Sequence, residues 1–215
     1  MSSELDSKYV GSTLQVLEKR CLNLLCEGYN EIVSQKKISA DWDEEDISKE
    51  LILCLAANPN RNEWKINIVP ELRLYSRDTS SAKKAPRIDF YFACWAPQEC
   101  KYFAEAKILI ETDVHKTGRK SKTTAESLHK RYVKTGIDSY LSGKYPSNGC
   151  LIGYVLQGKT ENIIGCLNRY LCTLNRVSEM LQRKSFGLKD FDECYISTRG
   201  NISIKHLMFN FVAEV

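Results

Sequence analysis

Two neighbouring segments in the middle of the chain constrain its fold more than any other feature. Arg87–Trp95 (RIDFYFACW) and Lys101–Ile110 (KYFAEAKILI) are rich in aromatic and aliphatic residues, and a turn at Pro97–Glu99 separates them. Such residues favour the pleated, buried surface of a β-sheet, and the short separation favours a hairpin. The chain therefore contains a buried sheet, which the surrounding elements have to cover.

The segments on either side of this hairpin change between helical and strand periodicity. Their order, α-α-β-β-β-α-β-α-β-β, predicts an α/β fold with a mixed central sheet flanked by helices. Helices are expected at Ser12–Gln35, Asp46–Ala57, Thr124–Leu141 and Glu161–Gln182. Further strands are expected at Ile66–Leu74, broken or bent at Pro70, at Cys150–Leu156, and in a C-terminal hairpin of Cys194–Thr198 and Ile202–Val212.

The composition is that of one globular domain covering residues 1–215. The 215 residues are 43% hydrophobic and 27% charged, which excludes global disorder, and no linker or repeat divides them. Uncharged apolar runs stay far below the roughly 20 residues that span a bilayer, and the N-terminus does not have the pattern of a signal peptide. We therefore expect a soluble, cytoplasmic protein. Its nine cysteines are then expected to be reduced thiols.

Charge is distributed unevenly along the chain. Residues 1–63 hold 12 acidic and 7 basic side chains, whereas residues 64–215 hold 15 acidic and 24 basic ones. The stretch Lys116–Lys134 alone carries seven bases against one acid, Glu126. A local basic stripe is compatible with a polyanionic partner such as nucleic acid. The alternative is a solvated loop and helix face without a partner.

Three charged residues lie inside the apolar hairpin: Asp89 in the first strand, and Glu105 and Lys107 in the second. Charges in such strands are unfavourable unless they are paired or bound to a metal. Strand alternation places Glu105 and Lys107 on one face, and pairing of the strands brings Asp89 to them. Two carboxylates with a backbone carbonyl suit Mg²⁺, and a lysine can hold water or neutralise a phosphate. The alternative is an ion pair that only fixes the register of the strands.

The tripeptide (Asp/Glu)-x-Lys occurs four times in the chain, so it has little meaning by itself. Only Glu105-Ala106-Lys107 lies in an apolar strand, with a strand aspartate 16 residues upstream and a helix downstream. In this context the sequence resembles the PD-(D/E)xK nuclease superfamily, also called the restriction-endonuclease-like fold. The resemblance implies an αβββαβ core over about residues 46–156, with the N-terminal helix and the C-terminal hairpin as additions. Ile88 stands where the motif has proline.

The resemblance also implies roles for individual residues. Asp89, Glu105 and the Ala106 carbonyl would bind Mg²⁺, for which Mn²⁺ can substitute, and Lys107 would orient the attacking water. Glu50, in the helix before the sheet, would bind a second metal ion. The resemblance makes Arg131 and Tyr132, in the following helix, the candidates to face the scissile phosphate. From its own composition, the loop before this helix, with Lys116, Arg119, Lys120 and Lys122, is expected to clasp a phosphate backbone; the alternative is a loop that is simply mobile.

The function expected from this resemblance is that of a Mg²⁺-dependent nuclease, with DNA as its expected substrate. Such a chain would be a restriction or defence endonuclease, homodimeric if it breaks both strands, or the nuclease subunit of a larger complex. The alternative is a catalytically inactive nucleic-acid-binding or assembly module on the same fold. A thiol enzyme is disfavoured, because no pairing of cysteine with histidine is visible in the sequence.

Overall fold

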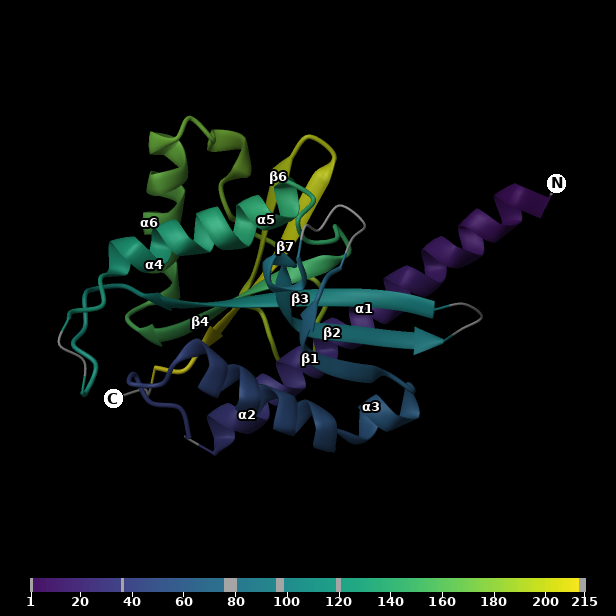
Figure 1. The fold of residues 1–215 in the computed structure, drawn as a ribbon, viewed down its shortest axis with the longest axis horizontal. Coiled ribbons are helices and arrows are strands. Elements are labelled where there is room, and N and C mark those ends of the chain that lie inside the picture. Colours follow the sequence, from purple (N-terminus) through teal and green to yellow (C-terminus); the bar gives the residue numbers. More distant parts are fainter. Residues whose placement is uncertain (1, 36, 76–80, 96–98, 119–120, 213–215) are drawn as a thin grey trace.

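A single mixed sheet organises the part of the chain that the computed structural model describes, which is residues 2–212 apart from 36, 76–80, 96–98 and 119–120. Its seven strands lie in the order β1-β2-β3-β4-β7-β6-β5 (Figure 1). The β3–β4 and β4–β7 pairs are parallel and the others are antiparallel. The strands are β1 (Asn67–Arg73), β2 (Arg87–Trp95), β3 (Glu99–Ile110), β4 (Gly149–Gln157), β5 (Gln182–Arg183), β6 (Cys194–Arg199) and β7 (Ile202–Asn210).

Helices cover both faces of this sheet. The N-terminal end of the first helix extends away from the rest of the chain (Figure 1). The helices are α1 (Ser2–Ser34), α2 (Glu44–Ala57), α3 (Pro59–Glu63), α4 (Ala125–Arg131), the π-helical turn η2 (Tyr132–Ile137), α5 (Asp138–Leu141) and α6 (Thr160–Thr173), with 3₁₀ turns η1 (Ala82–Lys84) and η3 (Val177–Glu179). None of these helices combines the length and the apolar character that crossing a bilayer requires.

Alternating side chains of the central strands form two separate cores. On β3, Ala104, Ala106 and Ile108 pack with α1 and α2, whereas Phe103 and Leu109 pack with η2, α5 and α6. This is the two-residue period of a strand that is buried on both faces, and it explains why β3 and β4 are apolar nearly throughout. The architecture is therefore α/β with a mixed, helix-flanked sheet, as the element order predicts.

Two expected helices differ from the observed ones in ways that have local causes. The helix expected at Glu161–Gln182 ends at Thr173, because Asn175 adopts a left-handed conformation (φ 57°) and the Arg176 N–H donates to the Leu171 carbonyl. The helix expected at Thr124–Leu141 contains the π turn η2. There the Thr135 hydroxyl donates to the Arg131 carbonyl, and Gly136 packs against Leu151.

Two further differences lie close to the β2–β3 hairpin. Strand β1 is continuous through Pro70, and its irregularity falls one residue later, at Glu71, which has a φ of 51°. Helix α2 begins at Glu44, two residues before the expected Asp46. Asp43 is its N-cap, and the Asp46 side chain accepts the Asp43 N–H to complete a capping box. The acidic run is thus the first turn of the helix.

Candidate functional site

The candidate site forms where β3 separates from β2. The antiparallel register of the two strands runs from Trp95↔Glu99 to Phe90↔Ala104 and stops there, while β3 continues beside β4 to Ile110. Continuing the first register would place Asp89 opposite Glu105. Instead of a ladder bond, the Asp89 Oδ2 accepts the backbone N–H of Ala106 at 2.8 Å. The Asp89 carboxylate therefore accepts the backbone N–H of Ala106, which has no partner on β2 where the two strands separate. This hydrogen bond fixes the carboxylate beside Glu105.

Glu105 and Lys107 are almost completely buried at this point, with 6% and 5% of their side chains exposed. The Lys107 Nζ lies 2.6 Å from Glu105 Oε1 and 2.6 Å from the Ala106 carbonyl oxygen. The Tyr145 hydroxyl, in the segment between α5 and β4, lies 3.1 Å from the same Oε1. The other oxygen, Glu105 Oε2, is buried and has no hydrogen-bond partner among the described residues. A buried carboxylate oxygen without a donor is unfavourable, so it indicates a missing partner.

Helix α2 supplies a third carboxylate, Glu44, from its first turn. Glu44 Oε1 lies 3.2 Å from Lys107 Nζ and 2.9 Å from Arg131 Nη2, and Oε2 accepts the Ile108 N–H at 3.2 Å. The Glu44 side chain is 15% exposed. The positive end of the helix dipole also favours a carboxylate at this position. Glu44 therefore joins the cluster from across the open edge of β3.

Burial and the proximity of like charges shift the pKa values of this cluster. Burial raises the pKa of the Glu105 carboxyl to about 7; Lys107 opposes the rise and Asp89 adds to it. Burial also raises the pKa of Asp89, against the opposing charge of Lys107. For Lys107, burial alone would lower the pKa, but the carboxylates of Glu105, Glu44 and Asp89 raise it above its ordinary value. Lys107 is therefore charged at neutral pH.

Glu50 does not lie in this cluster, which corrects its expected role as a metal ligand. It pairs with Lys37 and lines a different hollow, of about 640 Å³, between α1 and α2. The physical reason is helix phase: six residues at 3.6 residues per turn separate Glu44 and Glu50 by about 240° around the axis. The helix glutamate at the site is Glu44. The capping pattern of Asp43 and Asp46, which sets the start of the helix, is the sequence signal that could have identified it.

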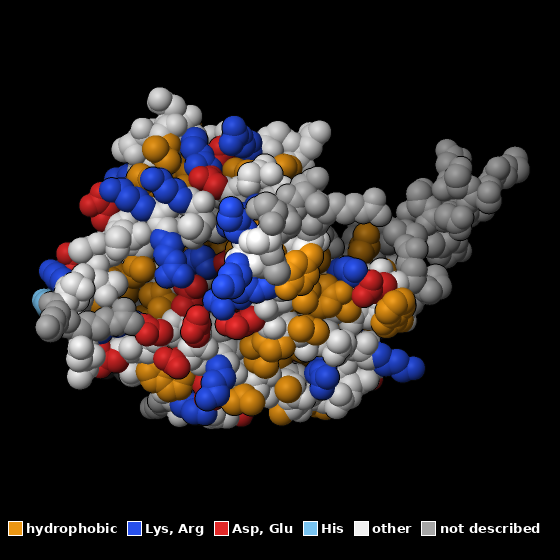
Figure 2. Space-filling view, in the orientation of Figure 1, with side chains coloured by type: hydrophobic (Ala, Val, Ile, Leu, Met, Phe, Trp, Pro, Cys, Tyr) orange, Lys and Arg blue, Asp and Glu red, His pale blue; other side chains and the backbone are white. Residues whose placement is uncertain are grey.

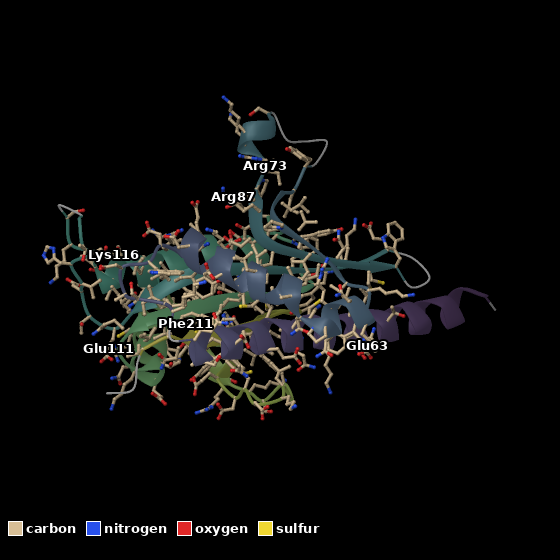
Figure 3. The ribbon with its side chains drawn as sticks, turned by 90° about the horizontal axis from the view of Figure 1, so that it is seen from below. Glu63, Arg73, Arg87, Glu111, Lys116 and Phe211 are labelled. Atoms are coloured by element: carbon tan, nitrogen blue, oxygen red, sulfur yellow. The ribbon has the colours of Figure 1, made fainter. Side chains whose placement is uncertain are left out.

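Glu44, Asp89 and Arg131 form the side of the cluster that lines a hollow of about 670 Å³ between α2, the β1–β2 strands and α4. Its lining carries acidic and basic side chains in nearly equal number, and Figure 2 shows acidic side chains gathered near the centre of this face with basic ones above them. In Figure 3, Arg73 and Arg87 lie at the base of a segment that stands out from the molecule, and Lys116 lies on a loop at one end. The charged lining residues are Asp43, Glu44, Glu45, Lys49, Glu71, Arg87, Asp89, Lys116 and Arg131.

Arg131 is the one expected nucleic-acid contact that the described structure places at the cluster. It ends α4, its side chain is 48% exposed, and it lines the hollow. Tyr132, its neighbour, is fully buried; its hydroxyl lies 2.9 Å from His206 Nδ1, and Ser197 Oγ lies 2.9 Å from His206 Nε2. The expectation that Tyr132 faces a phosphate is therefore wrong, because this side of the helix packs on the sheet.

The basic loop before α4 is attached to the segment before α2. Lys116 lines the rim of the hollow, but its side chain is buried and donates to the Trp42 carbonyl at 2.5 Å and to Asp43 at 3.2 Å. Contrary to expectation, Lys116 is therefore not free to bind a phosphate but connects the loop to the start of α2. The Lys122 side chain is half exposed, and its Nζ lies 3.4 Å from Asp113 Oδ2. Arg119 and Lys120 lie outside the described residues.

No group of three His, Cys, Asp or Glu side chains in the described ranges is arranged to hold a metal ion. The reason is visible in the contacts: Lys107 and Arg131 draw the carboxylates of Glu105 and Glu44 toward themselves. The donors nevertheless suit a hard divalent cation, because they are carboxylate and carbonyl oxygens, and one of them, Glu105 Oε2, lacks a partner.

All nine cysteines are free thiols, as expected. Burial raises the pKa of Cys21, Cys26 and Cys150, which is typical of inert packing residues and not of nucleophiles.

Comparison of the chain with protein-family models, with curated proteins and with solved structures gives no match. The function has to be argued from this geometry.

Proposed function

We propose that the protein is a metal-dependent nuclease that hydrolyses phosphodiester bonds, with DNA as its substrate. One observation carries the proposal: the unpartnered, buried Glu105 Oε2 lies in a cluster with the buried carboxylate of Asp89 and the buried ammonium of Lys107. Such a cluster would be an unfavourable way to fix the register of a strand. It is what a reaction that needs a cation and a fixed positive charge requires.

The topology supports assignment to the PD-(D/E)xK superfamily. Helix α2 precedes three antiparallel strands, β1 to β3, and the helical segment α4–α5 leads to β4, which is parallel to β3. This is the αβββαβ order that the resemblance implies. Asp89 and Glu105-Ala106-Lys107 lie on the second and third of these strands, where the motif would place them.

Asp89, Glu105, Glu44 and the Ala106 carbonyl would hold Mg²⁺ or Mn²⁺. When bound, the cation supplies a positive charge that stabilises the phosphate as negative charge develops on it. Asp89 is held in position by the Ala106 N–H and Glu105 by the Tyr145 hydroxyl, so both carboxylates are oriented before a ligand arrives.

The chain's own cations complete the chemistry. Lys107 is protonated at neutral pH, so it acts as a fixed positive charge that orients the attacking water and stabilises the phosphate. Arg131, half exposed at the hollow, binds the phosphate group. The water oxygen forms a bond to phosphorus and gives up a proton to solvent, while the bond to the 3′ oxygen breaks and that oxygen takes up a proton from solvent, which leaves 5′-phosphate and 3′-hydroxyl ends.

A second candidate is a non-catalytic nucleic-acid-binding or assembly module. The continuous chain of ion pairs from Glu105 through Lys107 and Glu44 to Arg131 favours it, because these charges already balance one another to a large extent without a ligand. The two candidates differ in whether Asp89 is needed for cation binding.

The deciding experiment is a cleavage assay with Mg²⁺ or Mn²⁺ on supercoiled, linear and single-stranded DNA and on RNA. Wild type is compared with Asp89→Asn and Lys107→Ala, with folding checked by circular dichroism. The proposal expects cleavage of DNA that both substitutions abolish. Absence of cleavage on every substrate, together with no Asp89-dependent binding of Mn²⁺, would leave the non-catalytic module as the function.

A further inference from the structure

Glu44 shares one oxygen between a buried cation and an exposed one. Its Oε1 lies 3.2 Å from Lys107 Nζ, which is 5% exposed, and 2.9 Å from Arg131 Nη2, on a side chain that is 48% exposed. Lys107 is also held by Glu105 and by the Ala106 carbonyl, each at 2.6 Å. Of the two cations, only Arg131 can therefore leave Glu44 without breaking the interior of the site.

The charges of the cluster are incomplete without Arg131. Three carboxylates, Asp89, Glu105 and Glu44, surround the ammonium of Lys107; Arg131 contacts Glu44, and Arg87, which is itself paired with Glu45 and Glu71, acts on Asp89. Carboxylates that are largely buried stay ionised only when positive charge lies close to them. If Arg131 left, Glu44 would keep only Lys107, which it shares with Glu105, and the missing positive charge is what a divalent cation provides.

A phosphodiester is the group that can take Arg131 away. Arg131 lines the open hollow, and a guanidinium binds two phosphate oxygens through parallel hydrogen bonds. Its contact with Glu44 is a single one of 2.9 Å, made through Nη2, at a half-exposed position. A phosphate group that accepts two hydrogen bonds from Arg131 therefore competes favourably with Glu44 for this guanidinium.

We infer that Arg131 couples the binding of nucleic acid to the binding of the cation. In the free protein it neutralises Glu44 and weakens the cation site. A phosphodiester in the hollow attracts Arg131, and Glu44 becomes available to the cation. Because binding linkage is reciprocal, the cation raises the affinity for nucleic acid by the same factor. The inference rests on the proposed function, and adds that the complete site forms only with the substrate present.

The test measures Mn²⁺ affinity by electron paramagnetic resonance of the free ion, with and without a short DNA duplex whose phosphorothioate linkages slow cleavage. For wild type, the duplex is expected to raise Mn²⁺ affinity on the order of tenfold. Arg131→Gln is expected to bind Mn²⁺ more tightly than wild type without the duplex, and to gain little when it is added. Lys134→Gln, which removes an exposed positive charge three residues along the same helix, is the matched control and is expected to behave as wild type.

Two results would overturn the inference. One is an equal gain from the duplex in Arg131→Gln and in wild type; the other is an unchanged duplex-free affinity in Arg131→Gln. If either occurs while wild type binds Mn²⁺ through Asp89 and cuts DNA, the proposed function stands and the coupling fails. If wild type binds no Mn²⁺ under either condition and cuts nothing, both fail.

Discussion

The Tyr145 hydroxyl lies 3.1 Å from Glu105 Oε1 and 3.0 Å from the Arg87 carbonyl oxygen, and thus connects the segment before β4 to a carboxylate on β3. Glu105 Oε1 is the oxygen that Lys107 also contacts, whereas the buried Oε2 has no hydrogen-bond partner among the described residues. Tyr145 is 4% exposed, and its aromatic ring packs against Tyr140. It is a positioning residue that acts through Glu105.

Removal of this hydroxyl should impair the site more than the fold. Tyr145→Phe keeps the ring and its packing but removes the hydrogen bond to the carboxylate, and bonds to charged groups contribute about 1.5–3 kcal/mol. We expect cleavage to fall roughly tenfold or more, as measured by the single-turnover rate with saturating Mg²⁺. Tyr140→Phe is the matched control, because the Tyr140 hydroxyl donates to the neutral Cys150 carbonyl at 2.7 Å. Equal losses of activity in the two variants would refute a specific role for Tyr145.

The buried Glu105 should also make stability depend on pH. Its pKa is about 7 in the folded protein and near 4.5 in the unfolded chain, so the folded state binds more protons between these values. Stability therefore decreases as pH rises from about 4.5 to 7, by about 3 kcal/mol when the change is complete. Urea unfolding of wild type and Glu105→Gln in the presence of a chelator measures this. Wild type should become less stable relative to Glu105→Gln as pH rises across this window. A difference in unfolding free energy that stays constant with pH would contradict the prediction.

Much of this fold follows from the periodicity of the sequence. Arg87–Trp95 and Lys101–Ile110 contain the β2 strand and most of β3, and their pairing brings Asp89 to Glu105. What periodicity does not give is where a helix begins. The helix expected from Asp46 leaves out Glu44, although its position three residues before the buried Ile47 places it on the side that faces the sheet. The π turn begins at Tyr132, where the sequence predicts a regular helix.

Contacts from irregular segments are the other part that the sequence does not reveal. Tyr145 precedes β4 outside any helix or strand, and neither an apolar period nor a motif marks it. The attachment of Lys116 to Trp42 and Asp43 joins positions more than 70 residues apart in the chain. Only the tertiary arrangement shows that this base is buried and not offered to a ligand.

The two glutamates of α2 provide a direct test of helix phase. Glu44→Gln removes a carboxylate from the cluster, whereas Glu50→Gln removes one from the hollow between α1 and α2. We expect Glu44→Gln to lower Mn²⁺ affinity and cleavage by about tenfold or more, and Glu50→Gln to leave both near wild type. Isothermal titration with Mn²⁺ and the cleavage assay measure the two effects. The reverse ranking would mean that the helix glutamate implied by the resemblance, Glu50, had been the correct choice.

His206 should remain neutral in the folded protein far below the pH at which an ordinary histidine becomes charged. Burial lowers its pKa to about 3, and its ring nitrogens face the hydroxyls of Tyr132 and Ser197, each at 2.9 Å. In the unfolded chain the pKa is near 6.5, so below that pH the unfolded state binds more protons, and stability falls by up to about 1.4 kcal/mol for each pH unit. Between pH 4.5 and 6.5 this slope opposes that of Glu105, so a comparison of wild type with Glu105→Gln is needed to separate them.

NMR of the histidine ring protons gives an independent measurement. The His206 signal should not shift between pH 8 and about 5. Titration of His206 near pH 6.5 in the folded protein would show that the Tyr132–His206–Ser197 network does not exclude the charged ring.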